Sequence, residues 1–378
     1  MKNIKSKTIQ NNKIVLISNY AWTVYNFRLP LINSLISNGY KVAVITQFDG
    51  YEKELKNYGC VVYNLFISRK GINPLIDIIT SLHIFFYLFV LKPSVCLTFT
   101  IKPVIYTSFV VRFLGIKNIA MITGLGTGFI KGGWLTLLVK KLYRFAFTKV
   151  SYVFFQNPSD QQLFWDHNLV DPFKCKLTPG SGIDLQKYVF SKVSNDSNTF
   201  IFLLIARLVW DKGIKEYLEA ARQLHEEFPE VQFRVIGPSG VQNRTAIPNS
   251  EIEKWRSENV IDYLGEVDDV RKYIKNSSCV VLPSYREGTS RVLLEASALA
   301  RPCIATNVPG CREVVLDEKS GFLCKVKSSH DLYLKMKKMY LLDQGKREEM
   351  GLVGRKHVET KFNHELVCQI YLDTLLDL

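Results

Sequence analysis

Short hydrophobic runs alternate with longer segments of helical spacing along the whole chain. Such uniformly apolar strands, separated by helix-length segments, are typical of parallel sheets covered on both faces. The rhythm breaks after residue 190 and then begins again, which predicts an α/β protein with two Rossmann-like halves. The expected strands lie at 13–18, 41–46, 94–99, 118–123, 151–156, 200–207, 231–237, 279–284 and 301–306.

A polar, turn-rich stretch separates the two halves. Residues 191–199 read SKVSNDSNT, and the preceding PGSGIDLQKY, residues 179–188, connects the halves. A length of 378 residues also fits two domains of roughly 150 residues each. We expect a first domain at 1–190 and a second at 191–378, whose last helix can pack back on the first.

Positive charge is concentrated in the first half. Residues 1–180 hold 21 of the 49 basic side chains but 7 of the 35 acidic ones, so they carry the whole net charge of +14. With 47% hydrophobic residues the chain can form packed cores and has no signature of disorder. The basic half therefore points to an anionic partner such as a phosphate, a nucleic acid or a membrane.

From the cysteines and the N-terminal segment we expect a cytoplasmic protein. The eight cysteines form no C-x-x-C pair and are expected to be reduced core residues. The apolar run at 14–17 is too short for a secretory signal. The stretch at 75–91 is shorter than the roughly 20 residues that cross a bilayer, so we expect no transmembrane segment.

Polar residues that follow strands are the candidates for chemistry, because open α/β sheets bind ligands beyond the carboxyl ends of their strands. Arg207 and Lys212 follow the first strand of the second half, in ARLVWDKG. Two cations beside a helix N-terminus suit a diphosphate. The alternative is a surface arginine and a lysine on a helix face.

A second candidate segment is YREGTSRVLLEA, which places Glu287 in a turn and Glu295 inside the next helix. A carboxylate among apolar neighbours needs hydrogen-bond donors, and a ribose diol supplies two. Gly288 and Thr289, at the helix start, add amides that can hold an anion. The alternative for Glu295 is a salt-bridged helix residue.

These motifs, with PGSGID before them and NVPGCREVV after, resemble the nucleotide-sugar glycosyltransferases of the large family 4, whose signature is the E-x7-E pattern at Glu287 and Glu295. Three segments of the first half resemble one branch of this family, which extends polyprenyl-diphosphate-linked saccharides and includes O-antigen enzymes. These segments read SNYAWTVYNFRLPLINSL, FTIKPVIY and ITGLGTGF. The resemblance implies the GT-B fold, in which two Rossmann-like domains face each other across a cleft. It also implies a UDP-sugar donor, of which GalNAc is our first choice, and retention of the anomeric configuration.

The resemblance further implies individual roles. Glu295 would bind the ribose hydroxyls and Glu287 those of the donor sugar, with Gly288 and Thr289 beside them. Arg207 and Lys212 would hold the diphosphate, where positive charge stabilises the leaving nucleotide. The strand-end loops of the first half contain no carboxylate suited to act as a nucleophile, and a donor-phosphate-assisted route needs none.

The first half is expected to bind the acceptor. Arg28 and Lys102 follow two of its strands, and cations there can grip a lipid-linked diphosphate; Asn26 and Gly124 lie near them. Either cation alone is also compatible with an ordinary surface charge. Many family members carry a histidine in the loop that here reads ITGLGTGF, so the proton acceptor stays open. No D-x-D pair is present, and we expect neither metal nor cofactor.

An amphipathic segment in the first half favours a peripheral site on the inner face of the cytoplasmic membrane. Residues 134–149 place Lys140, Lys141 and Arg144 beside a wide apolar face, and each cation near anionic lipid contributes about 1 kcal/mol. A core helix with a solvated stripe would have the same pattern, and the apolar residues 75–91 either assist docking or belong to the core.

Two other functions remain as alternatives. A nucleotide-sugar epimerase of the same fold would leave the basic amphipathic half without a purpose. A nucleic-acid-binding protein would use the net charge of +14, but no binding motif supports it and the E-x7-E pattern would have no role. We therefore expect a nucleotide sugar, a polyprenyl-linked acceptor and an anionic membrane as partners, and no nucleic acid.

Overall fold

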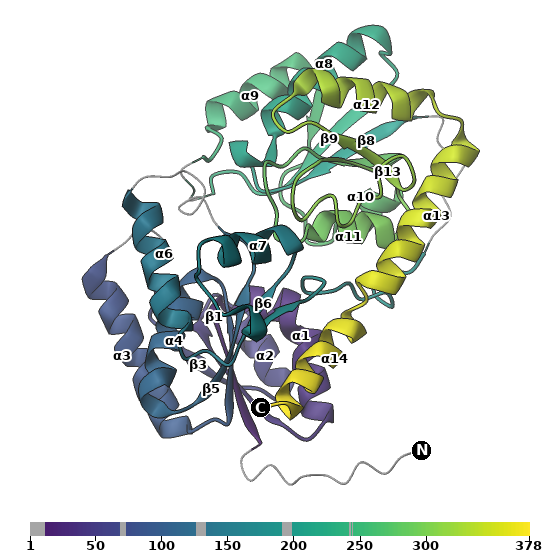
Figure 1. Ribbon diagram of the computed structural model, residues 1–378. Coiled ribbons are helices and arrows are strands. Elements are labelled where there is room, and N and C mark those ends of the chain that lie inside the picture. The colour runs from purple at the N-terminus through teal and green to yellow at the C-terminus, as the bar shows by residue number, and fades with distance from the viewer. Residues whose placement is uncertain (1–11, 69–72, 126–133, 191–198, 242, 244) are drawn as a thin grey trace, which may run out of the picture. The chain divides into compact units, whose positions relative to one another are not determined.

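The computed structural model describes residues 12–68, 73–125, 134–190, 199–241, 243 and 245–378. The chain divides into two compact units, residues 1–181 with 364–378 and residues 182–363. Each unit is built on one parallel sheet with helices on both faces (Figure 1). The fold class expected from the sequence is therefore confirmed. Of the stretch expected to separate the units, 191–199, residues 191–198 lie outside the described residues.

The sheet of the first unit has the strand order β3-β2-β1-β4-β5-β6-β7. Alternate strand residues point to opposite faces. On one face Ile14 and Leu16 pack under α1 and α14, and on the other Val15 and Ile17 pack under α3 and α4. The elements are β1 (Lys13–Tyr20), α1 (Ala21–Ser37), β2 (Lys41–Gln47), α2 (Glu52–Asn57), β3 (Val61–Asn64), α3 (Pro74–Leu91), β4 (Val95–Phe99), α4 (Ile101–Leu114), β5 (Lys117–Ile122), α6 (Trp134–Phe147), β6 (Tyr152–Phe155), α7 (Pro158–Asp166), the 3-10 turn η1 (Pro172–Lys174), β7 (Cys175–Leu177) and α14 (His364–Leu376).

The sheet of the second unit has the order β10-β9-β8-β11-β12-β13. Its two faces are covered by α8, α9 and α12 on one side and by α10 and α11 on the other. The elements are β8 (Ile201–Ile205), the 3-10 turn η2 (Trp210–Lys212), α8 (Ile214–Glu227), β9 (Gln232–Ile236), α9 (Asn249–Glu258), β10 (Ile261–Tyr263), α10 (Arg271–Lys275), β11 (Cys279–Leu282), α11 (Arg291–Ala298), β12 (Cys303–Thr306), β13 (Gly321–Cys324), α12 (Ser329–Leu341) and α13 (Gln344–Lys361).

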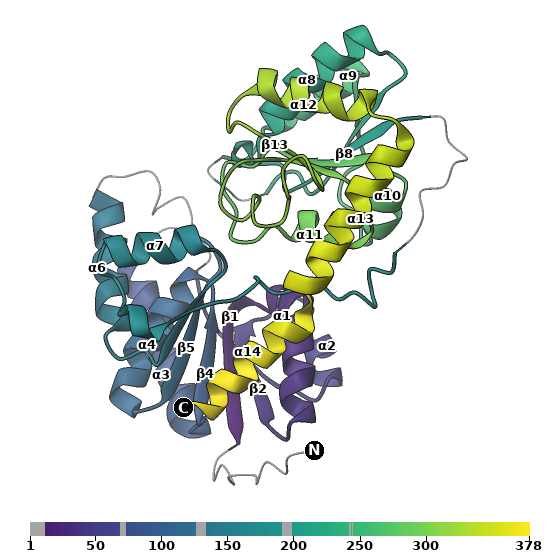
Figure 2. The same cartoon turned by 45° about the vertical axis from the view of Figure 1, so that its right-hand side comes forward.

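The boundary between the units differs from the one expected at 190/191, because it falls between Ser181 and Gly182. Residues 182–190 belong to the second unit: Ile183 and Tyr188 are buried in its core. The last helix belongs to the first unit, where α14 lies along α1 (Figure 2). Its Tyr371 is fully buried against the rings of Phe99 and Phe154, so apolar burial determines where the chain end packs.

Helix α3 has an unusual surface for a crossover helix. It begins after Asn73, whose side chain accepts hydrogen bonds from the amides of Leu75 and Ile76. Thr80, Ile84 and Leu88 form its buried stripe, and 17% of its 18 residues are buried. By length and composition alone α3 meets the description of a membrane-spanning helix, which the sequence interpretation of 75–91 did not anticipate.

Candidate active site

The second unit has its topological switch point between β8 and β11. The chain leaves β8 toward β9 on one side and β11 lies on the other, so the loops after β8 and β11 diverge. These loops carry the candidate residues: Arg207 and Lys212 follow β8, and Glu287 follows β11. The crevice at this point is where an open parallel sheet binds its ligand.

The two loops are packed directly on one another. Gly213 has a φ of +71°, and a Cβ added there would lie 2.0 Å from the carbonyl oxygen of Pro283, so side-chain-free backbone is required for this approach. The amide of Tyr285 donates to the carbonyl of Asp211 at 2.9 Å. The structure therefore joins the ends of β8 and β11 into one framework.

Lys212 and Glu287 form a salt bridge across this framework. Their side chains are 21% and 14% exposed, so both are largely withdrawn from solvent but reachable by a ligand. Arg207, by contrast, is exposed and has no ion pair among the described residues. Gly288 and Thr289 are half-buried in the loop that leads to α11, and Ser290 caps that helix through the amide of Leu293.

Glu295 is buried on α11 and has two side-chain partners. The hydroxyl of Tyr188 donates to its Oε1 at 2.8 Å, and Nε of Arg291 donates to the same oxygen at 3.1 Å. Glu295 also forms a salt bridge with Arg291 on the same helix, as the alternative interpretation from the sequence expected. Burial and the neighbouring Glu295 raise the pKa of the Tyr188 hydroxyl, which therefore remains a donor at physiological pH.

The sequence interpretation did not identify three further residues of this site. The hydroxyl of Tyr285 donates to Glu216 at 2.8 Å, and burial followed by that bond raises the pKa of Tyr285. Gly310, in the loop after β12, is packed against the backbone of Glu287. Tyr188 lies 107 residues before its partner Glu295, and no local pattern indicates such a pair.

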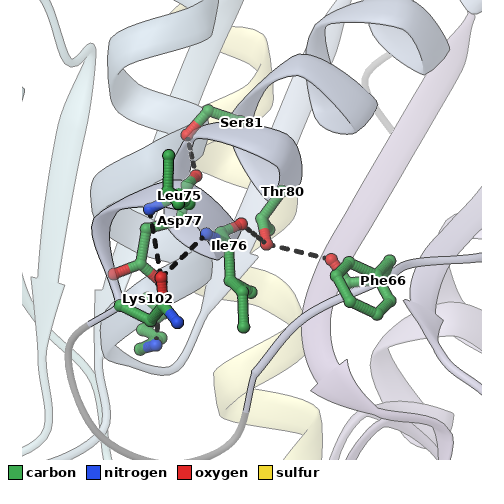
Figure 3. Close-up of polar contacts among 8 residues, drawn as sticks. Phe66, Leu75, Ile76, Asp77, Thr80, Ser81 and Lys102 are labelled. Carbon is green, nitrogen blue, oxygen red and sulfur yellow. Dashed lines mark hydrogen bonds and ion pairs between the residues drawn. The ribbon is translucent and has the colours of Figure 1, made fainter.

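The first unit has its own switch point, between β1 and β4, and Arg28 and Lys102 lie near it. Arg28 is only 5% exposed, and its guanidinium lies 4.3 Å from the ring centroid of Phe99 at the end of β4. Lys102 instead points to α3, where Nζ is 2.9 Å from Oδ1 of Asp77 (Figure 3). Neither residue is therefore an ordinary surface charge.

The neighbours of Lys102 hold Asp77 from a second side. Burial raises the pKa of Tyr106, and a hydrogen bond to Asp77 raises it further. Asn26 donates through Nδ2 to the carbonyl of Trp22. Gly124 lies two residues after β5 and has a φ of +138°. Residues 126–129 of the glycine-rich segment lie outside the described residues.

Two of the cations of helix α6 have hydrogen-bond partners beside α7. Lys140 lies 2.9 Å from Nε2 of His167, and Arg144 donates to the carbonyls of His167 and Asn168. Lys140 and Arg144 therefore contact the residues that follow α7, but Arg144 remains exposed, as does Lys141. A row of basic residues on a helix can face lipid headgroups or donate hydrogen bonds to carbonyl groups of a neighbouring segment. The periodicity of the sequence does not distinguish these two arrangements.

Within the part of the chain that the structure describes, no three histidine, cysteine, aspartate or glutamate residues gather as metal ligands. The eight cysteines are free thiols, and all except the partly exposed Cys175 are buried. Burial raises the pKa of Cys60 to about 11 and that of Cys303 to about 12. These thiols are accordingly protonated core residues.

Two family models match the chain in succession. Residues 13–157 match the model described as Glycosyl transferase 4-like, and residues 187–357 match Glycosyl transferases group 1. The chain belongs to the glycosyltransferases of the GT-B fold. This confirms the family resemblance, the fold and the class of enzyme expected from the sequence.

Curated relatives of this glycosyltransferase include one that matches over nearly the full length. It is N,N'-diacetylbacillosaminyl-diphospho-undecaprenol α-1,3-N-acetylgalactosaminyltransferase of Campylobacter jejuni, 27% identical over 95% of this chain and 97% of that protein. UDP-Gal:α-D-GlcNAc-diphosphoundecaprenol α-1,3-galactosyltransferase of Escherichia coli is also 27% identical, but over 50% of this chain and 51% of that one.

Solved structures share the architecture of this glycosyltransferase at low sequence identity. Sucrose-phosphate synthase from Thermosynechococcus elongatus has a TM-score of 0.80 at 18% identity, covering 97% of this chain and 100% of that one. The Anabaena protein HepE, solved with UDP-glucose, has a TM-score of 0.77 at 16% identity, with coverages of 97% and 100%. At these identities the likeness concerns the fold.

Proposed function

We propose that this glycosyltransferase moves a hexose or N-acetylhexosamine, with GalNAc as the first choice, from a UDP-sugar to a polyprenyl-diphosphate-linked saccharide. The reaction retains the anomeric configuration and serves the assembly of a bacterial surface polysaccharide or glycan. Support comes from the C. jejuni relative, whose name specifies an undecaprenol-linked acceptor and which matches along 95% of the chain. The E. coli relative is also named for a diphosphoundecaprenol acceptor.

The observation that carries the proposal is the Lys212–Glu287 pair at the switch point of the second sheet. The pair fixes both side chains, yet an ammonium has three donors and a carboxylate several acceptor positions. Lys212 can therefore hold the donor diphosphate with its remaining N–H groups while Glu287 accepts from sugar hydroxyls. The exposed Arg207 adds a second cation for the diphosphate.

The same arrangement serves the chemical step. Negative charge develops on the UDP oxygen as the glycosidic bond breaks, and Lys212 and Arg207 stabilise it. Positive side chains supply what a divalent metal supplies elsewhere, so we propose that transfer is metal-independent. Glu295 binds the ribose, and the amides of Gly288 and Thr289 complete the donor site.

On the acceptor side we propose that Lys102 binds the lipid-linked diphosphate. Its side chain is 20% exposed, and the pairing with Asp77 holds it at the start of α4. Arg28 is only 5% exposed and therefore offers a ligand less surface than Lys102 does. Its guanidinium packs on the ring of Phe99 at the end of β4.

We also propose that the exposed face of α3 rests in the cytoplasmic leaflet. The exposed fractions on this face run from 51% for Ile79 to 73% for Leu75, and Leu82, Phe86, Phe89 and Val90 lie within that range. Phe113 of α4 is 76% exposed, and α4 packs against α3, which extends the apolar face. Each such side chain moved from water into lipid contributes about 1 kcal/mol.

A lipid surface accounts for this face better than a membrane span does. The opposite side of α3 is held on the sheet by Thr80, Ile84 and Leu88, and the chain returns to β4 directly after it. Crossing the bilayer would break these contacts and the Asp77–Lys102 ion pair. The helix therefore lies along the membrane, where a lipid-linked acceptor is found.

Membrane docking can be tested apart from catalysis. We expect the protein to sediment with phosphatidylglycerol vesicles, and the double variant Leu82→Glu with Phe86→Glu to lose binding. Leu352→Glu is the matched control, because Leu352 is 52% exposed on α13 of the second unit. The proposal is wrong if the native protein does not bind vesicles but forms a dimer, and the α3 double variant is a monomer. This face would then be a contact between two copies of the chain.

The reaction is tested by offering UDP- and GDP-sugars with a polyprenyl-diphosphate N-acetylhexosamine in detergent and excess EDTA. A lipid product heavier by one sugar supports the proposal and names the donor, and NMR of its anomeric proton reports retention. Transfer that needs added magnesium would refute metal independence. Altered free sugar without a lipid product would favour epimerase chemistry.

A further inference from the structure

Glu295 uses one of its two carboxylate oxygens within the protein. The hydroxyl of Tyr188 and Nε of Arg291 both donate to Oε1, at 2.8 and 3.1 Å. No hydrogen bond among the described residues ends on Oε2. Glu295 is 8% exposed, and Oε2 does not belong to the fully buried side-chain atoms that lack a partner. This oxygen can therefore be reached from outside, and a carboxylate oxygen can accept hydrogen bonds from a ligand.

Tyr188 is well fixed for such a role. The residue is 4% exposed and belongs to the core that includes α11, and its amide donates to the carbonyl of Asp184 at 3.0 Å. Its own carbonyl accepts from Nη1 of Arg355 at 2.7 Å. Backbone and ring are therefore both held, and the hydroxyl has little freedom to leave Glu295.

Arg291 constrains the same carboxylate from the preceding helical turn. Four residues before Glu295, it forms the i,i+4 salt bridge on α11. Its Nη1 also donates to the carbonyl of Gly182 at 3.0 Å. Tyr188 and Arg291 thus hold Oε1 from two directions, with a segment at 182–188 that closes over α11.

We propose that Tyr188 and Arg291 are positioning residues, which fix Oε1 of Glu295 so that Oε2 accepts hydrogen bonds from the ribose hydroxyls of the nucleotide. The inference rests on the proposed donor site and adds the residues that prepare it. A carboxylate restricted to one rotamer before binding loses less conformational freedom on binding. The contribution of Tyr188 therefore depends on whether the ligand has ribose hydroxyls.

This dependence gives a test that a purely structural role would not pass. Calorimetry compares UDP with 2',3'-dideoxy-UDP on the native protein, Tyr188→Phe and Glu295→Gln. We expect Tyr188→Phe to weaken UDP about tenfold, the effect of losing roughly one oriented hydrogen bond, and to leave the dideoxy analogue unchanged. In the background of Glu295→Gln, Tyr188→Phe should cause no further loss.

Tyr217→Phe is the matched control, because the Tyr217 hydroxyl is also buried but donates to the carbonyl of Phe202 instead. It should not change the ratio of the two affinities. If Tyr188→Phe unfolds, Arg291→Gln, whose side chain is 25% exposed, tests the same prediction. Equal weakening of both ligands by these variants, or of neither, would overturn the inference.

The failure of the proposed function has a different signature. If the native protein binds no UDP, or if Glu295→Gln leaves the preference for UDP over the dideoxy analogue intact, Glu295 is not the ribose ligand. If Glu295→Gln abolishes that preference and Tyr188→Phe does not reduce it, the donor site stands and the positioning role is wrong.

Discussion

Replacing Gly310 with alanine should displace the loop that carries Glu287. Gly310 has a φ of +82°, and an added Cβ would lie 2.6 Å from the carbonyl carbon and oxygen of Glu287 and from the carbonyl oxygen of Gly288. Non-bonded heavy atoms are most favourably placed at about 3.5 Å or more. Because all three neighbours are backbone atoms, the two loops must separate by about 1 Å.

Two effects of the substitution can be estimated. An alanine in the left-handed region costs about 1–2 kcal/mol, and overpacking adds about 1–3 kcal/mol. We therefore expect the free energy of unfolding to fall by roughly 2–5 kcal/mol. A 1 Å displacement of a substrate-positioning group reduces the rate by about 100-fold, which corresponds to about 2.7 kcal/mol in activation free energy.

Gly39→Ala separates strain from displacement. Gly39 has a φ of +84°, nearly that of Gly310, but no atom lies within 4 Å of an added Cβ. Initial rates of sugar transfer and urea unfolding are measured for both variants. Gly39→Ala should lose about 1–2 kcal/mol of stability and keep its transfer rate. If folded Gly310→Ala transfers sugar as fast as Gly39→Ala, the close packing does not position Glu287.

Further variants test the remaining assignments. Glu287→Gln should abolish transfer but leave UDP affinity within about threefold by calorimetry, because it contacts the sugar and not the nucleotide; a comparable loss of UDP affinity would contradict this role. Asp77→Asn should raise the KM for the lipid acceptor by about tenfold without changing the KM for the donor, because Lys102 loses its orienting partner; a change confined to the donor would refute the acceptor assignment. Cys175, the thiol that is not buried, should be alkylated first by iodoacetamide in peptide mass analysis. Faster labelling of Cys60 or Cys303 would show that the buried core opens.

The strands that the sequence predicted are those at the centre of each sheet. The run at 41–46 is β2 (Lys41–Gln47), and the run at 94–99 contains β4 (Val95–Phe99). Their central residues are buried on both faces of the sheet, so the two runs are predominantly apolar. The edge strands β3, β7, β10 and β13 were not predicted. Each has only three or four residues, too short for a clear apolar run, and β3, β7 and β10 are also partly exposed.

The candidate donor residues were predicted more successfully than their partners. Loops after parallel strands can be located from the strands themselves, and this gave Lys212 and Glu287 before their salt bridge was known. The partners Tyr188 of Glu295 and Asp77 of Lys102 come from distant segments. The sequence around Glu295 or Lys102 does not indicate which distant segment packs against it.

By itself, the sequence determined the alternation of strands and helices, the two-unit α/β architecture and the E-x7-E motif. These follow from local periodicity and from residues a few positions apart. Tertiary structure decided which apolar surface is covered: it buries Tyr371 of the last helix in the first unit and leaves Leu82 and Phe86 of α3 exposed. Nearly every position of α3 is apolar, so its periodicity does not distinguish a buried face from an exposed one. That choice depends on which distant elements pack against the helix, because burial is a property of the assembled fold.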